Sequence, residues 1–264
     1  MQRSENMTNH QLREHICNAL TKGFRLDGRK MDEFRPLTIK TDCIRTAEGS
    51  AWVRCGETEL LVGIKLALEK PFPDTPDEGV LMVGAELLPL ANPAFESGPP
   101  GIESIETARV IDRGIRESHA IDTHQLCVEK GVKVWTVSVD ICPLNHDGNL
   151  IDLGGMAAIA ALKNAKFPMV KDGVIDYQEH QDKKLPIVET PIPVTVIKIG
   201  DNLLVDPTED EESVLDARLT MAFLENGNIC AMQKGGDEPI TSEEFEKMLE
   251  LGSRISKELR QKIR

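Results

Sequence analysis

The sequence predicts an α/β protein folded as a sandwich of two related lobes. In the first half of the chain, apolar residues alternate as in strands and then recur at helical spacing, and the same order returns after residue 190. A chain of 264 residues can form one large domain or two small ones. Because aromatic residues make up only 4% of the chain, aliphatic side chains must fill the core.

Residues 1–35 are expected to form an N-terminal helix and a turn. Thr8 or Asn9 is the predicted cap, the helix runs to about Lys22, and Gly23 ends it. The apolar residues of its buried face are Leu12, Ile16 and Leu20.

Residues 36–170 are expected to form the first lobe. Strand patterns between Leu37 and Lys65 predict an antiparallel meander, and another strand is predicted from Val80 to Leu90. The next stretch is rich in Pro and Gly and is predicted to be a loop, because this composition rules out regular structure. The remaining predicted elements are a helix over 102–121, a strand over 133–141 and a helix rich in small residues over 150–165.

Residues 171–190 are expected to form a connector, since the polar stretch 166–186 fits a connector or excursion better than a core element. Residues 191–264 form the expected second lobe. Its predicted elements are strands at 194–197 and 203–205, a hairpin that turns at Asn226-Gly227, and a closing helix that starts at the capping box Thr241-Ser242-Glu243-Glu244.

The composition limits the class of function. A formal charge of −13 excludes nucleic-acid binding over the whole surface, so any such binding must be local. Six cysteines without a C-x-x-C pair predict free thiols in a reducing compartment. The polar N-terminus and the lack of a long apolar run predict a cytoplasmic protein without a membrane partner.

Three arginines of the predicted helix 102–121 share one face: Arg109, Arg113 and Arg116, called the arginine stripe below. One interpretation is ion pairing within the helix, because Glu106, Asp112 and Glu117 stand at suitable spacings. The other is a row of guanidinium groups that bind the phosphates of a nucleic-acid backbone. In that case an acidic chain would bind nucleic acid only through this stripe.

The turn before the predicted helix 150–165 has the form of an anion site. A glycine-containing strand-to-helix turn presents free backbone N–H groups at the positive end of the helix dipole, as a bound phosphate requires. Leu150 and Ile151 follow this turn and supply neither a hydroxyl nor a cation. The turn therefore predicts an anion site that lacks its charged side chains.

Between Asp201 and Asp216 the chain has seven carboxylates and no basic residue. Metal-dependent hydrolysis is one interpretation, but consecutive acids cannot converge on one ion, which favours a solvated helix N-terminus after Pro207. Asp216 opens a strand, and both a turn-capping role and a site role stay open for it. The six histidines lack a metal-ligand pattern and are expected to be solvated, with only His146 placed beside the turn.

Several short motifs together resemble the RNase PH family of phosphorolytic exoribonucleases. They are Asp27-Gly28-Arg29, Phe34-Arg35-Pro36-Leu37, Ala47-Glu48-Gly49-Ser50-Ala51, Gly56-Glu57-Thr58 and the Asp-Gly turn before the helix. This resemblance covers nearly the whole chain. It implies an RNase PH-type fold of two lobes with ribosomal protein S5 domain 2-like architecture.

Within the family, the chain is similar to the non-catalytic, second RNase PH-like ring subunit of the archaeal exosome. The residues that carry this similarity are Val205-Asp206-Pro207-Thr208, Asp216-Ala217-Arg218 and the arginine stripe. The resemblance implies three kinds of partner: a catalytic sister that alternates with this chain in a hexameric ring, RNA-binding cap subunits, and single-stranded RNA. It implies no cofactor and no metal.

A catalytic sister has Asp-Gly-Gly-(Ser/Thr)-Arg at the turn, where this chain has Asp147-Gly148-Asn149-Leu150-Ile151. The sister also has two arginines where Ile102 and Glu103 stand here, whereas Asp216 matches the aspartate of the catalytic pattern. The resemblance therefore implies no catalytic residue in this chain. It implies a vestigial phosphate site made of Gly148, Asn149, Leu150 and Ile151.

Three alternatives stay open at this point. In an active phosphorolytic homohexamer, Asp216 is the general acid, and His146 or Arg109 replaces the missing phosphate ligand. In a metal-dependent hydrolytic nuclease, the acidic run binds the metal. In a purely structural ring subunit, the arginine stripe is only ion-paired.

Overall fold

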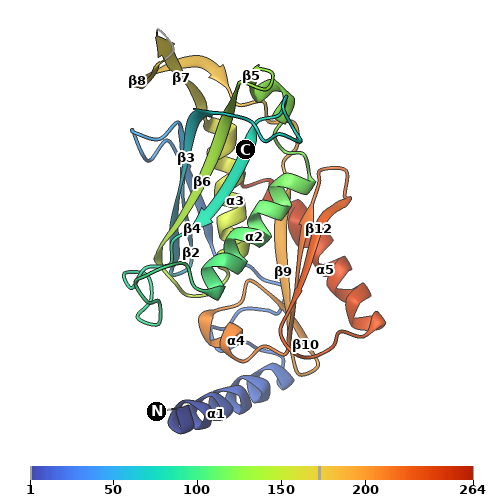
Figure 1. The fold of residues 1–264 in the computed structure, drawn as a ribbon. Helices are drawn as coiled ribbons and strands as arrows, with labels where there is room; N and C mark the ends of the chain where they lie inside the picture. Colours follow the sequence, from blue (N-terminus) through green and yellow to red (C-terminus); the bar gives the residue numbers. More distant parts are fainter. Residues whose placement is uncertain (1, 172–173, 264) are drawn as a thin grey trace.

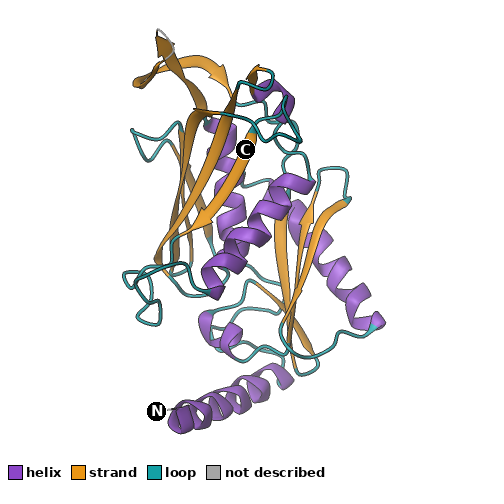
Figure 2. Cartoon of the chain, viewed as in Figure 1, coloured by secondary structure: helices purple, strands orange, loops and turns teal. Residues whose placement is uncertain are grey.

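The computed structural model describes residues 2–171 and 174–263, with residues 2–9 placed by their backbone alone. Its elements form alternating layers (Figure 1). Helices α2 (Ile102–Glu117) and α3 (Leu150–Asn164) lie between two β-sheets, and helix α5 (Ser242–Arg260) covers the outer face of the second sheet (Figure 2). Within the described ranges, no helix is both long and apolar enough to cross a bilayer.

The first sheet has six strands and confirms the predicted meander. Strands β1, β2, β3 and β6 pair antiparallel in that order, β4 joins the far side of β6 in parallel, and β5 also pairs with β6. Their bounds are Leu37–Thr41 (β1), Gly49–Cys55 (β2), Thr58–Glu69 (β3), Val80–Ala85 (β4), Cys127–Glu129 (β5) and Lys133–Asn145 (β6). The strand expected to reach Leu90 ends at Ala85, because residues 88–91 form a turn with Pro89 at its second position, closed by the hydrogen bond from Ala91 N to Leu88 O (2.9 Å).

The second sheet has the strand order β10-β9-β11-β12. Its strands are β9 (Ile192–Ile199), β10 (Asn202–Val205), β11 (Ala217–Phe223) and β12 (Ile229–Gly235). The predicted hairpin at Asn226-Gly227 joins β11 to β12, and α5 begins at Thr241 with both halves of its capping box formed. Both predictions are confirmed.

Helix α2 ends four residues before its predicted end. Ser118 is its C-cap, and His119 has a φ of 52°, a left-handed conformation that an α-helix cannot continue. A short 3-10 helix, η1 (Thr123–Leu126), then leads into β5. The residues expected to complete the helix, up to Ile121, instead pass through a tight turn and an isolated bridge to Ile187.

Helix α3 is buried on nearly every side because it contacts both sheets. A Cβ atom on Gly154 would lie 2.8 Å from Ile111 of α2, and one on Gly155 would lie 2.6 Å from Pro193 of β9. Small residues on opposite faces therefore let α2 and β9 approach the α3 backbone closely. The small-residue composition that predicted this helix is explained by its central position.

Strands β7 (Lys166–Lys171) and β8 (Val174–Lys184) form an antiparallel ribbon that projects from the first sheet (Figure 1). Most of the residues described on β8 are exposed, so the sequence carries no alternation of apolar and polar residues there. Its strand structure was not predicted from the polar composition. We keep residues 36–170 and 191–264 as the proposed lobes, with the ribbon lying between their sheets in sequence.

The N-terminal helix α1 (Gln2–Thr21) starts before the expected cap at Thr8 or Asn9, since no Gly or Pro interrupts the preceding residues. The predicted end at Gly23 is confirmed by its φ of 85°. Ile16 and Leu20 are buried against β9 and β10, with Leu12 packed on this cluster. Helix α1 therefore covers the part of the second sheet that lies nearest helix α4 (Glu209–Ser213).

A buried polar contact joins α3 to the second sheet. Asp152 is fully buried and accepts hydrogen bonds from Thr195 N (2.8 Å) and Thr195 Oγ1 (2.7 Å). The Thr195 hydroxyl also lies 2.9 Å from the Thr220 hydroxyl. Burial raises the pKa of Asp152 to about 6, although both bonds from Thr195 oppose that rise.

We expect Asp152→Asn to flatten the dependence of stability on pH. The rise of the Asp152 pKa from 3.8 to about 6 means that the folded state favours the protonated acid, so this contribution is present below about pH 4 and is lost as the pH rises through about 6. The shift corresponds to about 3 kcal/mol. Urea unfolding across this range measures it, with the exposed Asp210→Asn as control. Equal slopes in wild type and Asp152→Asn would contradict the assignment.

Candidate RNA-binding surface and vestigial phosphate site

The turn at the start of α3 is covered by the segment that leads into α4. Gly148 has a φ of 80°, and a Cβ on it would lie 2.4 Å from the carbonyl oxygen of Pro207. Asn149, the N-cap, is left-handed at φ 61° and almost fully buried. The glycine is therefore required both by the backbone conformation and by this close approach.

A carboxylate of the chain itself occupies the N-terminus of α3. The backbone N–H of Asn149 donates to Oε1 of Glu212 at 2.9 Å. Burial raises the pKa of Glu212 to about 7, while the Asn149 N–H and the charge of Arg218 oppose that rise. The N–H group at this helix end is thus already bound to a carboxyl group of the chain itself.

The two remaining residues of the predicted vestigial phosphate site, Leu150 and Ile151, are buried in the core. Leu150 and Ile151 are 5% and 8% exposed and belong to the main apolar cluster. The structure brings all four predicted residues together at one turn. It places an internal acid and two apolar side chains there.

Asp206, on the loop between β10 and α4, is the centre of a buried network of charges. Its side chain accepts hydrogen bonds from Arg35 Nε (2.9 Å), Arg35 Nη2 (2.8 Å), Arg29 Nη1 (2.8 Å) and Asn149 Nδ2 (2.8 Å). Burial alone would raise the pKa of Asp206, but the hydrogen bonds and charge of Arg35, with the charge of Arg29, hold it below its usual value. Asp206 therefore ties the segment after α1 to the turn at α3.

A second buried ion pair extends this network. Arg25 donates to Glu211 from Nε (2.9 Å) and Nη2 (2.5 Å), and to the carbonyl oxygen of Val205 (2.9 Å). Glu211 also closes the capping box with Thr208 at the start of α4. We call Arg25, Arg29, Arg35, Asp206 and Glu211 the Asp206 network.

The acidic run does begin a helix after Pro207, as predicted, but it is not simply solvated. Glu211 pairs with Arg25, Glu212 binds Asn149, and Glu209 accepts from Asn92 Nδ2 at 2.6 Å. These acids therefore point to different partners, as expected from consecutive positions. Among the described residues, no group of three or more His, Cys, Asp or Glu side chains is arranged to hold a metal ion.

Asp216 uses both carboxylate oxygens in structural contacts. Oδ2 accepts from the backbone N–H of Gly200 at 2.6 Å, and Oδ1 lies 2.7 Å from Nη2 of Arg13 on α1. The carboxylate thus caps the turn between β9 and β10 and fixes α1 to it. This geometry matches the turn-capping interpretation.

The ring of His146 lies beside that of Phe95, with ring centroids 5.2 Å apart, and its buried Nδ1 has no hydrogen-bond partner among the residues that the structure describes. Burial lowers its pKa, so the imidazole is neutral at pH 7. A neutral ring cannot replace a phosphate-binding cation. The other histidines are exposed, as predicted: His10, His15, His119, His124 and His180.

The arginine stripe is exposed on α2, and its members differ in their partners. Arg116 pairs with Asp112 (2.7 Å), as one interpretation predicted, and also donates to the Leu81 carbonyl (3.0 Å). The other two expected pairs, Glu106 with Arg109 and Arg113 with Glu117, do not form within this fully described helix. Glu106 binds Arg218 of β11 instead, and Arg113 binds Gln233 of β12. Arg109 and Arg113 line an open groove of about 380 Å³ beside Gln233 of β12.

Sequence reasoning missed the roles of Arg25, Arg29 and Arg35. Only a cluster of arginines between the first helix and the first strand indicated them, and nothing in the sequence paired them with Asp206 or Glu211 far along the chain. All six cysteines are free thiols, which confirms that prediction.

Residues 33–168 match domain 1 of the 3′ exoribonuclease family, RNase PH, and residues 189–255 match domain 2. The chain belongs to the RNase PH family. Exosome complex component Rrp42 of Methanocella arvoryzae is 46% identical over 251 residues, which cover 95% of each chain. The protein of the same name from Thermococcus kodakarensis is 46% identical over 256 residues, 96% of this chain and 94% of that one.

Solved structures of the RNase PH family show the same fold. A chain of the Archaeoglobus fulgidus exosome with RNA bound to the active site is 44% identical, with a TM-score of 0.91 over 98% of this chain and all of that one. A chain of an archaeal exosome core has a TM-score of 0.88 at 40% identity, covering 98% and 99%. The predicted family and fold class are thereby confirmed.

We expect Arg35→Ala to lower the free energy of unfolding by about 3 kcal/mol or more, since it leaves the buried Asp206 without its main counter-charge. Arg113→Ala removes an exposed arginine and should change stability by less than about 0.5 kcal/mol. Urea unfolding monitored by circular dichroism measures both. A similar small loss in the two variants would show that the Asp206 network does not stabilise this RNase PH fold.

Proposed function

We propose that this chain is a non-catalytic subunit of an archaeal exosome ring. It alternates with a catalytic RNase PH-like sister, supports the active site of that sister, and helps bind single-stranded RNA for 3′-to-5′ phosphorolysis. Near-full-length similarity to archaeal exosome components supports this assignment. The same similarity supports RNA-binding cap subunits as further partners, and the six free thiols fit a cytoplasmic location.

The observation that carries the non-catalytic role is the state of the turn at α3. Phosphorolysis requires inorganic phosphate aligned with the scissile bond, and most of the catalysis is positioning and charge neutralisation by donors and cations. Here Glu212 already accepts the N–H of Asn149, and Leu150 and Ile151 supply neither a hydroxyl nor a guanidinium. A phosphate at this turn would therefore have to displace Glu212 from the N–H of Asn149, and Leu150 and Ile151 would offer it no compensating donor.

The alternative of an active homohexamer has little support in the geometry. Asp216 holds Arg13 and Gly200, and the buried His146 ring is neutral. The alternative of metal-dependent hydrolysis is also disfavoured, since the acids of the run have separate partners. A second role is RNA binding, which the exposed guanidinium groups of Arg109 and Arg113 support.

The arginine stripe would contact RNA through backbone phosphates. Guanidinium groups give charge-assisted hydrogen bonds to phosphate oxygens, and such contacts carry no base sequence. Degradation of RNA of any sequence requires this kind of contact. An RNA phosphate would have to compete with Asp112 for Arg116, so Arg109 and Arg113 make the larger contribution to RNA binding.

We expect the chain alone to release no nucleoside diphosphates from single-stranded RNA in the presence of phosphate, because it lacks a phosphate site. Addition of a catalytic sister should produce release of nucleoside diphosphates that depends on phosphate. This release should not depend on a metal ion bound to this chain. Chromatography of the nucleotide products measures both. Phosphate-dependent release by a preparation proven free of the sister would refute the non-catalytic assignment.

We expect Arg113→Glu to slow RNA degradation by the assembled ring on the order of tenfold at limiting RNA, because a phosphate contact becomes repulsive. Ring assembly, measured by size-exclusion chromatography with light scattering, should be unchanged. Arg254→Glu, at an exposed position of α5, is the matched control and should retain the wild-type rate. An unchanged rate for Arg113→Glu at raised salt would favour the purely structural alternative.

A further inference from the structure

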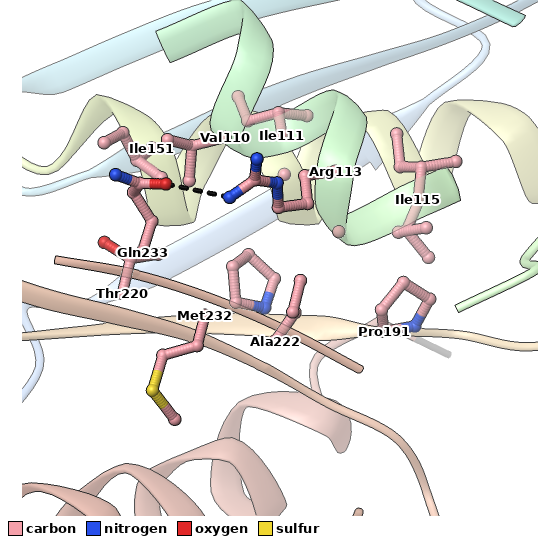
Figure 3. A pocket seen from close by; sticks show the side chains of 15 residues that line it. Val110, Ile111, Arg113, Ile115, Ile151, Pro191, Thr220, Ala222, Met232 and Gln233 are labelled. Atoms are coloured by element: carbon pink, nitrogen blue, oxygen red, sulfur yellow. Dashed lines mark hydrogen bonds between the residues drawn. The ribbon is translucent and has the colours of Figure 1, made fainter. Parts of the chain in front are cut away.

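The two lobes meet at a hydrogen bond between the arginine stripe and the second sheet. Nη1 of Arg113, on α2, donates to Oε1 of Gln233, on β12, at 3.0 Å (Figure 3). Nε2 of the same amide donates to the backbone carbonyl of Lys234 at 3.0 Å. The second bond directs the oxygen of the amide toward Arg113, since its nitrogen is already used.

A narrow crevice beneath this bond supports both side chains. Val110, Ile111 and Ile115 of α2 lie across it from Ala222 of β11 and from Pro191, which precedes β9, and Arg113 and Gln233 line it too (Figure 3). Its free volume is about 20 Å³, room for a single water molecule. The crevice is therefore too small for a ligand, and its walls act as packing for the stem of Arg113.

The charge of the acceptor distinguishes Arg113 from its neighbour Arg116. Asp112 binds Arg116 through a carboxylate, which cancels the positive charge locally. Gln233 binds Arg113 through a neutral amide, which fixes the direction of the guanidinium and leaves its charge intact. Among the residues that the structure describes, no carboxylate lies within ion-pair distance of Arg113.

We propose that Gln233 is a positioning residue for RNA binding: its neutral amide orients the Arg113 guanidinium from the second lobe and keeps its charge available for an RNA phosphate. The proposal rests on the RNA-binding role given above for the arginine stripe. An arginine held in place before binding loses less side-chain freedom when phosphate arrives. A carboxylate at position 233 would hold the same geometry and cancel the charge.

Substitution at position 233 separates orientation from charge. The ring reconstituted with its catalytic sister is titrated with a fluorescent single-stranded oligoadenylate, without phosphate so that no RNA is degraded, at several salt concentrations. Gln233→Ala should weaken binding about threefold and leave the salt dependence unchanged, because only orientation is lost. Gln233→Glu should weaken binding about tenfold and reduce the salt slope by about one, because one phosphate contact loses its cation.

Both changes are repeated in an Arg113→Ala background. If Gln233 acts through Arg113, neither Gln233→Ala nor Gln233→Glu should weaken binding further there. A loss with Gln233→Glu that persists without Arg113 would reflect general repulsion and would overturn the proposal, as would wild-type binding by Gln233→Ala. If Arg113→Ala itself binds RNA normally, the RNA-binding role of the stripe fails too, so the two failures are distinguishable. Thermal unfolding checks that each variant is folded.

Discussion

The Asp206 network is the constraint on which the site depends. Asp206 accepts hydrogen bonds from Arg29, Arg35 and Asn149, so one carboxylate holds the segment after α1 and the turn before α3. Asp206, Arg35 and Asn149 are buried, and each buried charge needs its partner to offset the loss of hydration. Arg25 and Glu211 hold α4 in the same place, which brings Glu212 to the end of α3. The position of the internal anion is therefore a consequence of a charge network in another part of the sequence.

The elements with strong local signals could be predicted from the sequence. The meander, the Asn226-Gly227 hairpin and the capping box at Thr241 follow from alternation, turn chemistry and capping, all of which act between residues close in sequence. The ribbon β7–β8 was missed because β8 is largely polar and exposed and so carries no strand pattern. The end of α2 depends on a left-handed His119, a conformation that the residue type alone does not specify.

The candidate site, too, could be predicted from the sequence only in part. Its turn was found because glycine and helix signals are adjacent, and its missing cation was visible as Leu150 and Ile151. The partners of the acidic run were not visible, because Arg25 and Asn92 lie far from it in sequence. Spacing on the helix predicted three ion pairs for the arginine stripe, and one formed, since β11 and β12 supply the competing partners Arg218 and Gln233. Contacts between the lobes thus decide which arginines stay available.

The burial of Leu150 and Ile151 has a further consequence for substitutions at this turn. A working anion site keeps polar and charged groups that cost stability, whereas these two side chains add apolar contacts to the core. Introducing a hydroxyl and a guanidinium here would place polar groups in apolar space and beside Glu212, so several positions would have to change together. A single substitution toward a hydroxyl or a guanidinium at this turn would therefore be penalised by the packing that now surrounds it.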